Sequence, residues 1–306
     1  MKFSVIIPVY NKADTLMQSV ESVLRQSYDD FEIVIVDDGS TDGFAAIAEQ
    51  LSVIRKIRII RQANAGVSVA RNTGIKHAEG TFICFLDGDD LYHPDHLQEL
   101  SRMAEKYPEH DYFATSHVTS YPDGRTIGSA RLLKAYPQDF VCENLFHLLN
   151  TCGDGVIHTN SMCIRKSLML ENNLFFEPGE KIGEDTDLWF RTALLRPIII
   201  SQKETTVYQR EFSTATAATT NSMTWIFPRR LDAIKAMDIP APIKTACEKL
   251  VDRYKMTCSR DYLRMSDKKA ARRILKTVAH KTCKYYISVM LCVAPLKLSK
   301  CLIAHI

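Results

Sequence analysis

The chain has 306 residues, of which 46% are hydrophobic and 25% charged. That length suits one large α/β domain with an appendage, or two smaller domains, and the composition excludes a wholly disordered chain. The formal net charge of +3 hides an asymmetry, because residues 241–306 carry 15 Lys and Arg against 4 Asp and Glu. The two parts of the chain are therefore expected to meet different partners.

Short apolar runs and helix-like segments alternate over the first third of the chain. The apolar runs are rich in β-branched residues and predict buried strands at residues 3–9, 31–36, 57–60 and 81–86. The longer segments between them predict helices at residues 14–26, 43–51, 67–78 and 94–107. Such alternation is typical of right-handed βαβ units around a parallel sheet.

The remainder of the chain has a more mixed pattern. Further strands are predicted at residues 112–121, 156–164, 198–201 and 205–208, and a helix is predicted at residues 185–195. From about residue 221 onward the pattern is helical. We therefore predict an α/β domain over residues 1–215, followed by a helical C-terminal region over residues 216–306.

The cysteines and two neighbouring histidines give no sign of a zinc site. The nine cysteines are scattered without any Cys-x-x-Cys spacing, which argues against structural zinc and against a secreted disulfide framework. Reduced thiols in a reducing compartment are the simpler interpretation. His93 and His96 are expected to begin a surface helix rather than to hold a metal.

Polar side chains follow three of the predicted strands at the points where the strands end. Tyr10 and Asn11 follow the first strand, residues 37–40 (Asp-Asp-Gly-Ser) the second, and residues 87–90 (Asp-Gly-Asp-Asp) the fourth. In an open parallel sheet these ends share one edge, and ligands bind there. The alternative is that each Asp caps a helix or closes a turn, and for residues 37–41 alone a cap is favoured. Three carboxylates within residues 87–90 repel one another unless a cation compensates them, and Mg²⁺ or Mn²⁺ suits such oxygens.

Two common nucleotide-binding motifs are missing from the sequence. The loop after the first strand, at residues 9–12, has no glycine, so the G-x-G-x-x-G fingerprint of dinucleotide binding is absent. A P-loop is absent as well. A nucleotide must then be held by another geometry.

Five motifs occur in order along the chain, at spacings that make coincidence a poor explanation. They are Ser4-Val5-Ile6-Ile7-Pro8-Val9-Tyr10-Asn11, Asp37-Asp38-Gly39-Ser40-Thr41-Asp42, Asn64-x-Gly66-x4-Arg71-Asn72-x-Gly74, Leu86-Asp87-Gly88-Asp89-Asp90 and Gly183-Glu184-Asp185. Over residues 2–210 this set resembles the family 2 glycosyltransferases with the GT-A fold. The resemblance implies a Rossmann-like, mostly parallel sheet flanked by helices, with a nucleotide-binding half at residues 1–110 and an acceptor half at residues 111–215.

The resemblance implies a donor-binding role for residues after the first two strands. Pro8, Tyr10 and Asn11 would line the nucleobase pocket, with Tyr10 available for stacking. Asp38 would accept a hydrogen bond from a uracil-like imide N–H. Asn64 would belong to the same donor site.

The resemblance also implies a diphosphate and metal site. Arg71 would lie near the diphosphate or the sugar, although its local sequence suits a solvated helix residue equally well. Asp87 would face the ribose, with Gly88 beside it in the donor site. Asp89 would bind a divalent metal, Mn²⁺ or Mg²⁺, together with Asp87, whereas Asp90 is expected to be a neighbour or a helix cap.

The Gly183-Glu184-Asp185 segment opens a predicted helix, where the helix dipole favours acidic residues in any case. The family places its catalytic carboxylate at the second acidic residue of such a pair, which here is Asp185. The resemblance therefore implies that Asp185 is the general base of an inverting transfer. Glu184 is expected to act behind it, and Asp187 to lie on the surface.

One departure from the family concerns a histidine that often follows the strand after this helix. No histidine stands there in this sequence, and Glu211 is the residue expected in its place. The details of metal dependence stay open for that reason.

The C-terminal region combines basic and apolar stretches. Residues 267–284 are rich in Lys and Arg, and residues 285–296 are apolar except for an interruption at Pro295. This combination suits attachment to an anionic membrane surface, and the alternative is a helical appendage with a solvated basic face. Nucleic acid is not expected as a partner, because aromatic residues are not interleaved with the basic ones.

The apolar run at the start of the chain is too short for a signal peptide, and no stretch of about 18 uninterrupted apolar residues exists. We therefore expect a cytoplasmic protein, attached peripherally to the inner face of the plasma membrane if the C-terminal region binds lipid.

The sequence thus predicts an inverting glycosyltransferase that takes a sugar from a nucleotide-diphosphate donor, most simply a UDP-linked one. The expected acceptor is a hydroxyl of a saccharide or lipid-linked saccharide in cell-surface polysaccharide or glycolipid assembly. One alternative is a sugar nucleotidyltransferase, which would usually show a glycine-rich N-terminal loop followed by basic residues. The other is a non-catalytic, membrane-associated binding protein on the same fold.

Overall fold

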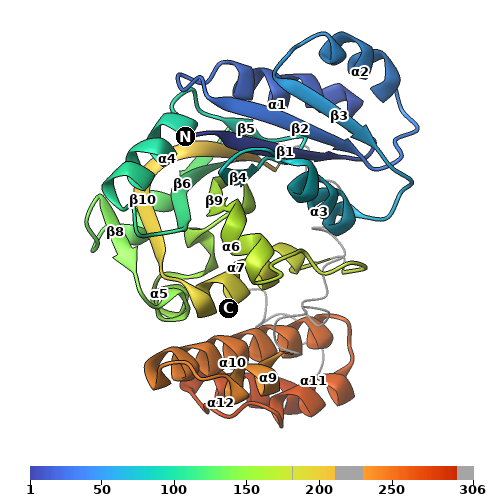
Figure 1. Ribbon diagram of the computed structural model, residues 1–306. Helices are drawn as coiled ribbons and strands as arrows, with labels where there is room; N and C mark the ends of the chain where they lie inside the picture. Colours follow the sequence, from blue (N-terminus) through green and yellow to red (C-terminus); the bar gives the residue numbers. More distant parts are fainter. Residues whose placement is uncertain (181, 211–229, 295–306) are drawn as a thin grey trace. The chain divides into compact units, whose positions relative to one another are not determined.

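The computed structural model describes residues 1–180, 182–210 and 230–294 (Figure 1). The chain divides into two compact units, Met1–Thr214 and Ala215–Ile306. The first unit is an α/β domain with a central sheet flanked by helices, and the described part of the second unit is helical, so the predicted fold class is confirmed. Glu211, the residue expected in place of the missing histidine, lies outside the described residues.

The described part of the first unit contains one ten-stranded sheet, with the order β3-β2-β1-β4-β9-β6-β10-β5. Two further strands pair beside this path, β7 with β6 and β8 with β10. The strands are β1 Phe3–Val9, β2 Phe31–Asp37, β3 Ile57–Arg61, β4 Phe82–Phe85, β5 Leu91–Tyr92, β6 Tyr112–Ser120, β7 Thr126–Gly128, β8 Asp139–Cys142, β9 Met162–Arg165 and β10 Ile198–Gln209. Pairing is parallel across β3-β2-β1-β4 and between β6 and β10, and antiparallel at the other pairs.

The order of the first four strands brings their carboxyl ends to one edge. Phe3 of β1 is in register with Phe31 of β2 on one side and with Phe82 of β4 on the other. Val9 at the end of β1 lies opposite Asp37, and Asp37 lies opposite Arg61 of β3. The polar residues that follow these strands therefore start from neighbouring points.

Helices cover both faces of the sheet (Figure 1). The helices of the first unit are α1 Ala13–Leu24, α2 Phe44–Ser52, α3 Val67–His77, α4 His96–Lys106, α5 Leu145–Cys152, α6 Lys166–Glu171 and α7 Glu184–Leu195, with short 3-10 turns at Ser129–Leu133, Asp154–Val156 and Thr159–Ser161. In the view of Figure 1, α1 and α2 lie above the sheet and α3 lies below it. The burial pattern agrees, because every side chain of β1 and β2 is buried.

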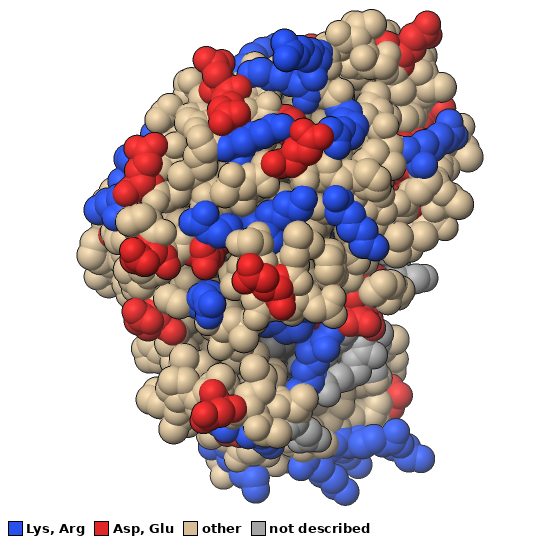
Figure 2. Space-filling model, viewed as in Figure 1, with Lys and Arg blue, Asp and Glu red and all other residues tan. Residues whose placement is uncertain are grey.

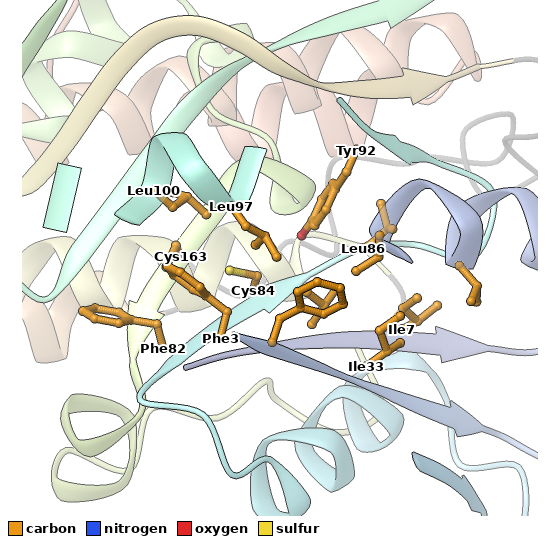
Figure 3. Packing of buried hydrophobic residues seen from close by; sticks show 14 of the residues in the cluster. Phe3, Ile7, Ile33, Phe82, Cys84, Leu86, Tyr92, Leu97, Leu100 and Cys163 are labelled. Atoms are coloured by element: carbon orange, nitrogen blue, oxygen red, sulfur yellow. The ribbon is translucent and has the colours of Figure 1, made fainter. Parts of the chain in front are cut away.

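The core on the α1 face begins with alternate residues of β1 (Figure 3). Phe3, Ile7 and Ile33 are buried in one cluster with Leu97 and Leu100 of α4. Burial of each side chain of this size stabilises the folded domain by about 1.5–3 kcal/mol. The same cluster holds Cys84 and Cys163, which supports the interpretation of these cysteines as small core hydrophobes.

Two strand predictions in the second half of this unit are corrected by the structure. Residues 156–164 were expected to be one strand, but only Met162–Arg165 pairs, and residues 159–161 form a 3-10 turn. This turn carries polar side chains that bond to neighbouring loops, so the backbone leaves the ladder there. The two short strands expected at residues 198–201 and 205–208 are instead one strand, β10, which shifts its register against β6 between Ser201 and Thr206.

His96 is also not where the sequence suggested, because its side chain is fully buried. Its Nδ1 lies 2.7 Å from the Thr205 hydroxyl, and that hydroxyl donates to Thr115. Nδ1 therefore carries the proton, and Nε2 has no partner. Burial lowers the pKa of His96 to about 3.

The described helices of the second unit are α9 Leu231–Ala236, α10 Ala241–Arg264, α11 Lys268–Leu275 and α12 Cys283–Val293. Leu263, Leu275 and Leu291 share a small core drawn from α10, α11 and α12. Asp252 of α10 ties the turn before α12, because its carboxylate accepts the backbone N–H groups of Ala279 and His280. Among the helices that the structure describes, none has the length and apolarity needed to cross a membrane.

Candidate active site

The loops that follow β1 and β2 are fastened to each other. The backbone N–H of Asp38 donates to the Val9 carbonyl at 2.8 Å, and the Asn11 side-chain oxygen accepts the N–H of Thr41 at 2.8 Å. Asn11 adopts a left-handed conformation with φ of 52°, which asparagine tolerates better than most residues. Its own N–H donates to the Ser40 hydroxyl. Asn11 thus connects the two loops through hydrogen bonds at the carboxyl edge of the sheet.

Asp38 holds a third loop at the same edge. Its carboxylate is buried and accepts three hydrogen bonds, from the Gln62 side chain and from the backbone N–H groups of Ala65 and Gly66, at 2.7–3.0 Å. Gly66 has a φ of 91°, a conformation that favours glycine. One lone-pair position of the carboxylate is left for a further donor. The predicted bond from Asp38 to a nucleobase stays a prediction.

The other residues predicted to bind the donor lie around this edge. Tyr10 is half exposed, whereas Pro8 at the end of β1 is buried. Asn64 is exposed, and its backbone N–H would be 3.0 Å from a Cβ added at Gly39, which has a φ of 78°. A side chain at position 39 would therefore push the Asn64 loop away from the edge.

Arg71 on α3 is buried and bridges two carboxylates from distant segments. Its Nη2 lies 2.8 Å from Asp87 and its Nη1 lies 3.0 Å from Glu184, while its Nε has no partner. Burial opposes the charge of Arg71, but Asp87, Glu184 and Asp185 outweigh burial and raise the pKa of Arg71. The alternative of a solvated helix residue is therefore wrong for Arg71.

The pKa values of the two carboxyl groups beside Arg71 are shifted in opposite directions. Burial favours protonation of Asp87, yet Arg71, His158 and Lys12 hold the pKa of Asp87 below its usual range. Burial and the neighbouring Asp185 raise the pKa of Glu184 to about 7, against the opposing effect of Arg71. Asp87 is thus the more strongly ionised partner of the guanidinium.

The residues around Arg71 in its motif position helix α3. The Asn72 side chain accepts the backbone N–H of Phe176 at 2.9 Å and donates to the carbonyl of the same residue at 2.7 Å. A Cβ added at Gly74 would lie 2.4 Å from Ile6 of β1, so only glycine lets α3 approach the sheet this closely. Together these contacts set the position of Arg71 relative to β4 and α7.

The acidic turn after β4 faces the loop after β1. Lys12 forms an ion pair with Asp89, and the Thr15 hydroxyl donates to the Gly88 carbonyl at 2.7 Å. Burial raises the pKa of Asp89, against the opposing effect of Lys12. Asp90 is buried and accepts the backbone N–H of Gln209 at 2.7 Å, and burial raises its pKa well above the usual value. Asp90 therefore fastens the turn to β10.

The two carboxylates predicted to hold a metal, Asp87 and Asp89, do not form a complete metal site from protein ligands alone. Among the described residues, no group of three or more His, Cys, Asp or Glu side chains is arranged to hold a metal ion. Mg²⁺ in nucleotide-using enzymes is commonly held by one or two carboxylates together with substrate phosphates, so Asp87 and Asp89 would be enough. Burial leaves Asp89 with a raised pKa, and a cation would favour its charged form.

Asp185 stands in the first turn of α7, and each of its carboxylate oxygens has a donor. Oδ1 accepts the backbone N–H of Thr186 at 2.6 Å, and Oδ2 accepts the hydroxyl of Thr159 at 2.7 Å. Asp187 was expected on the surface, but its side chain is fully buried and forms an ion pair with Arg191 at 2.8 Å. The burial of Asp187 was not indicated by the sequence.

Some residues at this site were missed by sequence reasoning. The Asn160 side chain accepts the backbone N–H of Asp87 at 3.0 Å and donates to Asp90, so it links the acidic turn to the Thr159–Ser161 turn. His158 is close enough for the charges of Asp87 and Asp185 to act on it. A histidine thus does lie in this cluster, although it comes from a part of the sequence well before residue 211. Lys12 could have been noticed beside Tyr10 and Asn11, whereas residues 158–160 carried no local signal.

The structure therefore gathers Arg71, Asp87, Glu184 and Asp185 into one network, with Asp89 joined through its own turn. Asp38 and Asn11 belong to the adjoining loops at the same edge. This carboxylate network lies at the carboxyl edge of a largely parallel sheet, which is where α/β proteins commonly bind their ligands.

Solved structures place this architecture in the GT-A glycosyltransferase fold. S. aureus TarS (residues 1–349), solved with UDP-GlcNAc, matches with a TM-score of 0.71 at 18% identity, over 98% of this chain and 88% of that one. The mannosyltransferase PcManGT from Pyrobaculum calidifontis, solved with GDP-Man and Mn²⁺, matches with a TM-score of 0.59 at 17% identity, over 99% and 84% of the two chains. At such identities the likeness shows the fold alone.

Sequence comparison then gives the family. The family described as "Glycosyl transferase family 2" matches residues 4–169, which is more than half of the chain, and the chain belongs to that family. The uncharacterized glycosyltransferase EpsJ of Bacillus subtilis is 45% identical over 186 residues, covering 60% of this chain and 53% of EpsJ. The glycosyltransferase GlyA of Streptococcus pneumoniae is 30% identical over 204 residues, covering 65% of this chain and 29% of GlyA. The chain thus matches about half or less of the length of these relatives.

Proposed function

We propose that this chain transfers a sugar from a nucleotide-diphosphate donor to an acceptor hydroxyl with inversion at the anomeric carbon. The observation that carries the proposal is the single network of Arg71, Asp87, Glu184 and Asp185 at the carboxyl edge of the sheet. It couples a carboxylate suited to act as a base to the acidic turn suited to a metal and a diphosphate. This pairing is what an inverting transfer requires.

In the proposed reaction Asp185 accepts the proton of the acceptor hydroxyl, and the hydroxyl oxygen bonds to the anomeric carbon. The bond between that carbon and the diphosphate breaks, and its electron pair stays on the leaving diphosphate oxygen. Asp185 is left protonated and returns its proton to solvent. Inversion follows, because attack and departure occur on opposite faces of the sugar.

The chain's own residues would organise this step. Asp89, together with Asp87, would hold Mn²⁺ or Mg²⁺, which supplies charge stabilisation to the diphosphate when bound. Arg71 would hold the acidic turn and the first turn of α7 in fixed positions relative to each other, because it bonds to both. Pro8, Tyr10, Asn11, Asp38 and Asn64 would receive the nucleoside beside the loops that Asp38 fastens.

The donor we favour is UDP-linked, with GDP-linked sugars as the competing case. TarS was solved with UDP-GlcNAc and PcManGT with GDP-Man, so this fold accepts both nucleotides. For the acceptor we propose a hydroxyl of a saccharide or lipid-linked saccharide used in cell-surface polysaccharide or glycolipid assembly, as family membership suggests.

The test is nucleotide release from a panel of UDP- and GDP-sugars with Mn²⁺, comparing wild type with Asp185→Asn. We expect turnover to fall by about 10²- to 10⁴-fold while donor binding, followed by calorimetry, stays near wild type. Asp123→Asn, in an exposed turn where Asp123 pairs with Arg125, is the matched control and should keep its turnover. Near-normal turnover by Asp185→Asn would sink the assignment of the base. Pyrophosphate release from a sugar phosphate and UTP would favour a nucleotidyltransferase, and binding without turnover a non-catalytic protein.

We also propose that the C-terminal unit attaches the protein peripherally to an anionic membrane surface. One face of α12 exposes Tyr286, Ile287, Met290 and Val293, whose exposed fractions run from 42% to 71%. The exposed basic residues of the same unit include Lys269, Arg272, Arg273, Lys276, Lys281 and Lys284. Figure 2 shows blue side chains gathered on the surface of this unit. An apolar stripe beside basic residues is the pattern of interfacial helices.

Vesicle sedimentation tests the attachment. The full chain should bind vesicles of phosphatidylglycerol and phosphatidylcholine, and far less to phosphatidylcholine alone, with binding weakened by salt. Met290→Glu should reduce binding, because it places a charge in the apolar stripe. Val53→Glu, at a residue of the first unit that is 83% exposed, is the matched control. Equal binding of all three proteins would refute the attachment.

A further inference from the structure

Thr159 lies between the buried indole of Trp189 and the carboxylate of Asp185. Its hydroxyl is 2.7 Å from Oδ2 of Asp185 and 3.4 Å from Nε1 of Trp189. Asp185 and Trp189 stand four residues apart on α7, so they share a face of that helix. Thr159 is itself 2% exposed, which keeps water from replacing these bonds.

The chemistry of the three groups fixes the direction of both hydrogen bonds. The indole N–H can only donate, and an ionised carboxylate can only accept. The threonine hydroxyl must therefore accept from Trp189 and direct its own hydrogen to Asp185. The hydroxyl has one hydrogen, so the bond from the indole leaves it one favourable orientation.

The indole itself is held firmly. Trp189 is 2% exposed, and its ring lies 5.6 Å from Phe85, 5.9 Å from Phe176 and 6.4 Å from Tyr112, measured between ring centroids. Phe85 belongs to β4, which leads into the acidic turn. The ring packing thus connects the orientation of Thr159 to the centre of the sheet.

The second oxygen of Asp185 is held from its own helix. Oδ1 accepts the N–H of Thr186 at 2.6 Å and the Thr186 hydroxyl at 3.2 Å, so both oxygens of the carboxylate have donors and it cannot rotate without losing a bond. Oδ2, whose donor is the Thr159 hydroxyl, keeps a free lone-pair position. A base fixed in this way still has room to receive a proton.

We propose that Thr159 is a positioning residue for the transfer, and that it orients the Asp185 carboxylate through the Trp189–Thr159–Asp185 relay. This role rests on the proposed function of Asp185. Thr159 touches neither donor nor acceptor in the proposal, and it acts only through Asp185. Its neighbour Asn160 ties the same turn to Asp87, so the base and the acidic turn take their positions from one short segment.

The test compares Thr159→Val, which keeps the shape and removes the hydroxyl, with Thr159→Ser, which keeps the hydroxyl. The readout is UDP release from UDP-GlcNAc with Mn²⁺. Thr159→Val should lower kcat by about 10- to 100-fold and leave the donor KM within about twofold, because a misplaced base slows the chemical step without changing donor binding. Thr159→Ser should recover most of the kcat. The matched control is Thr192→Val on the same helix, whose buried hydroxyl bonds only to the Leu188 carbonyl and whose loss should leave kcat unchanged.

A second readout needs no activity. The chain has two tryptophans, so a ¹⁵N spectrum contains two indole signals at most. The Trp189 signal should move in Thr159→Val and in Asp185→Asn, and stay in place in Thr192→Val.

The outcomes separate the relay from the function on which it rests. If Asp185→Asn abolishes turnover while Thr159→Val keeps the wild-type kcat, the relay is wrong and the base assignment stands. If Thr159→Ser loses as much kcat as Thr159→Val, packing rather than the hydroxyl is responsible, and the relay is again wrong. An unmoved indole signal in a folded Thr159→Val variant would also overturn it. Turnover of no nucleotide sugar by the wild type, or wild-type kinetics of Asp185→Asn on the donor that the wild type uses, would overturn the function and the relay together.

Discussion

Arg71→Met is expected to destabilise the first unit by about 4 kcal/mol at pH 8, because two buried carboxyl groups share the Arg71 guanidinium. The Arg71 side chain is 5% exposed, and its two ion pairs measure 2.8 Å to Asp87 and 3.0 Å to Glu184. Removing one partner of a buried pair costs about 3–5 kcal/mol, since the other partner is left charged and buried. Two broken ion pairs would cost twice as much if both carboxylates stayed charged. We expect a cost within the range for one pair, because either carboxyl group can take up a proton and become neutral.

Because the carboxyl groups can be protonated, the loss of stability caused by Arg71→Met depends on pH. Without Arg71 the lowered pKa of Asp87 rises, and so does the pKa of Glu184, which is already about 7 in the wild type. The folded variant then binds more protons than its unfolded chain, so its stability increases as the pH falls. Each proton taken up recovers about 1.4 kcal/mol per pH unit. The difference between wild type and Arg71→Met should therefore shrink to about 2 kcal/mol at pH 6.

Urea unfolding followed by circular dichroism at the two pH values measures this difference. Arg58→Met is the matched control, because Arg58 pairs with Glu79 on the surface, where ion pairs contribute little. Arg71→Lys should lose an intermediate amount, since an ammonium cannot span two carboxylates as the guanidinium does. A cost for Arg71→Met that equals the cost for Arg58→Met, or that is the same at both pH values, would refute the reasoning.

Three other predictions follow from particular contacts. Asp89→Asn should weaken the Mn²⁺-dependent binding of UDP in a thermal-shift assay by about tenfold, with Asp123→Asn unchanged, and undiminished binding would count against a metal at Asp89. Gly74→Ala should lower the free energy of unfolding by about 1–3 kcal/mol, because the new Cβ would meet Ile6 at 2.4 Å; an unaltered urea midpoint would show that α3 can move away from β1. The wild type should lose about 1 kcal/mol per pH unit below pH 6 through His96, whose depressed pKa makes folding favour its neutral form, and His96→Asn should flatten that part of the curve relative to the wild type.

The nucleotide-binding half was predictable from sequence because its information is local. Each buried strand corresponds to a continuous apolar run in the sequence. Polar residues follow directly where the strand ends, as at Asp38 and Asp87. The glycines also carry local meaning, since Gly66 has a conformation that other residues avoid and Gly74 makes room for Ile6. Helices α1 to α4 were located for the same reason, with ends that differ by a few residues.

The acceptor half was less predictable because its information is non-local. β9 enters the sheet between β4 and β6 and runs antiparallel to both, and no pattern in its four residues indicates that position. The preceding turn was mistaken for strand, so Thr159 and Asn160 were not placed beside Asp185 and Asp87. The burial of Asp187 was missed for a related reason, since its partner Arg191 lies on the same helix and gives the pair the appearance of a solvated salt bridge.

The balance of charge in the carboxylate network bears on the proposed metal. Asp87, Asp89, Asp90, Glu184 and Asp185 face only two paired cations among the described residues, Arg71 and Lys12. Burial raises the pKa values of Asp90 and Glu184 and so reduces their share of the negative charge. Arg71 is nevertheless already paired with Asp87 and Glu184, and Lys12 with Asp89. Neither cation is therefore free to neutralise an incoming diphosphate. We therefore predict that a donor, which adds negative charge to this network, binds together with a cation from solution, and that chelation by EDTA abolishes donor binding itself rather than only slowing the transfer.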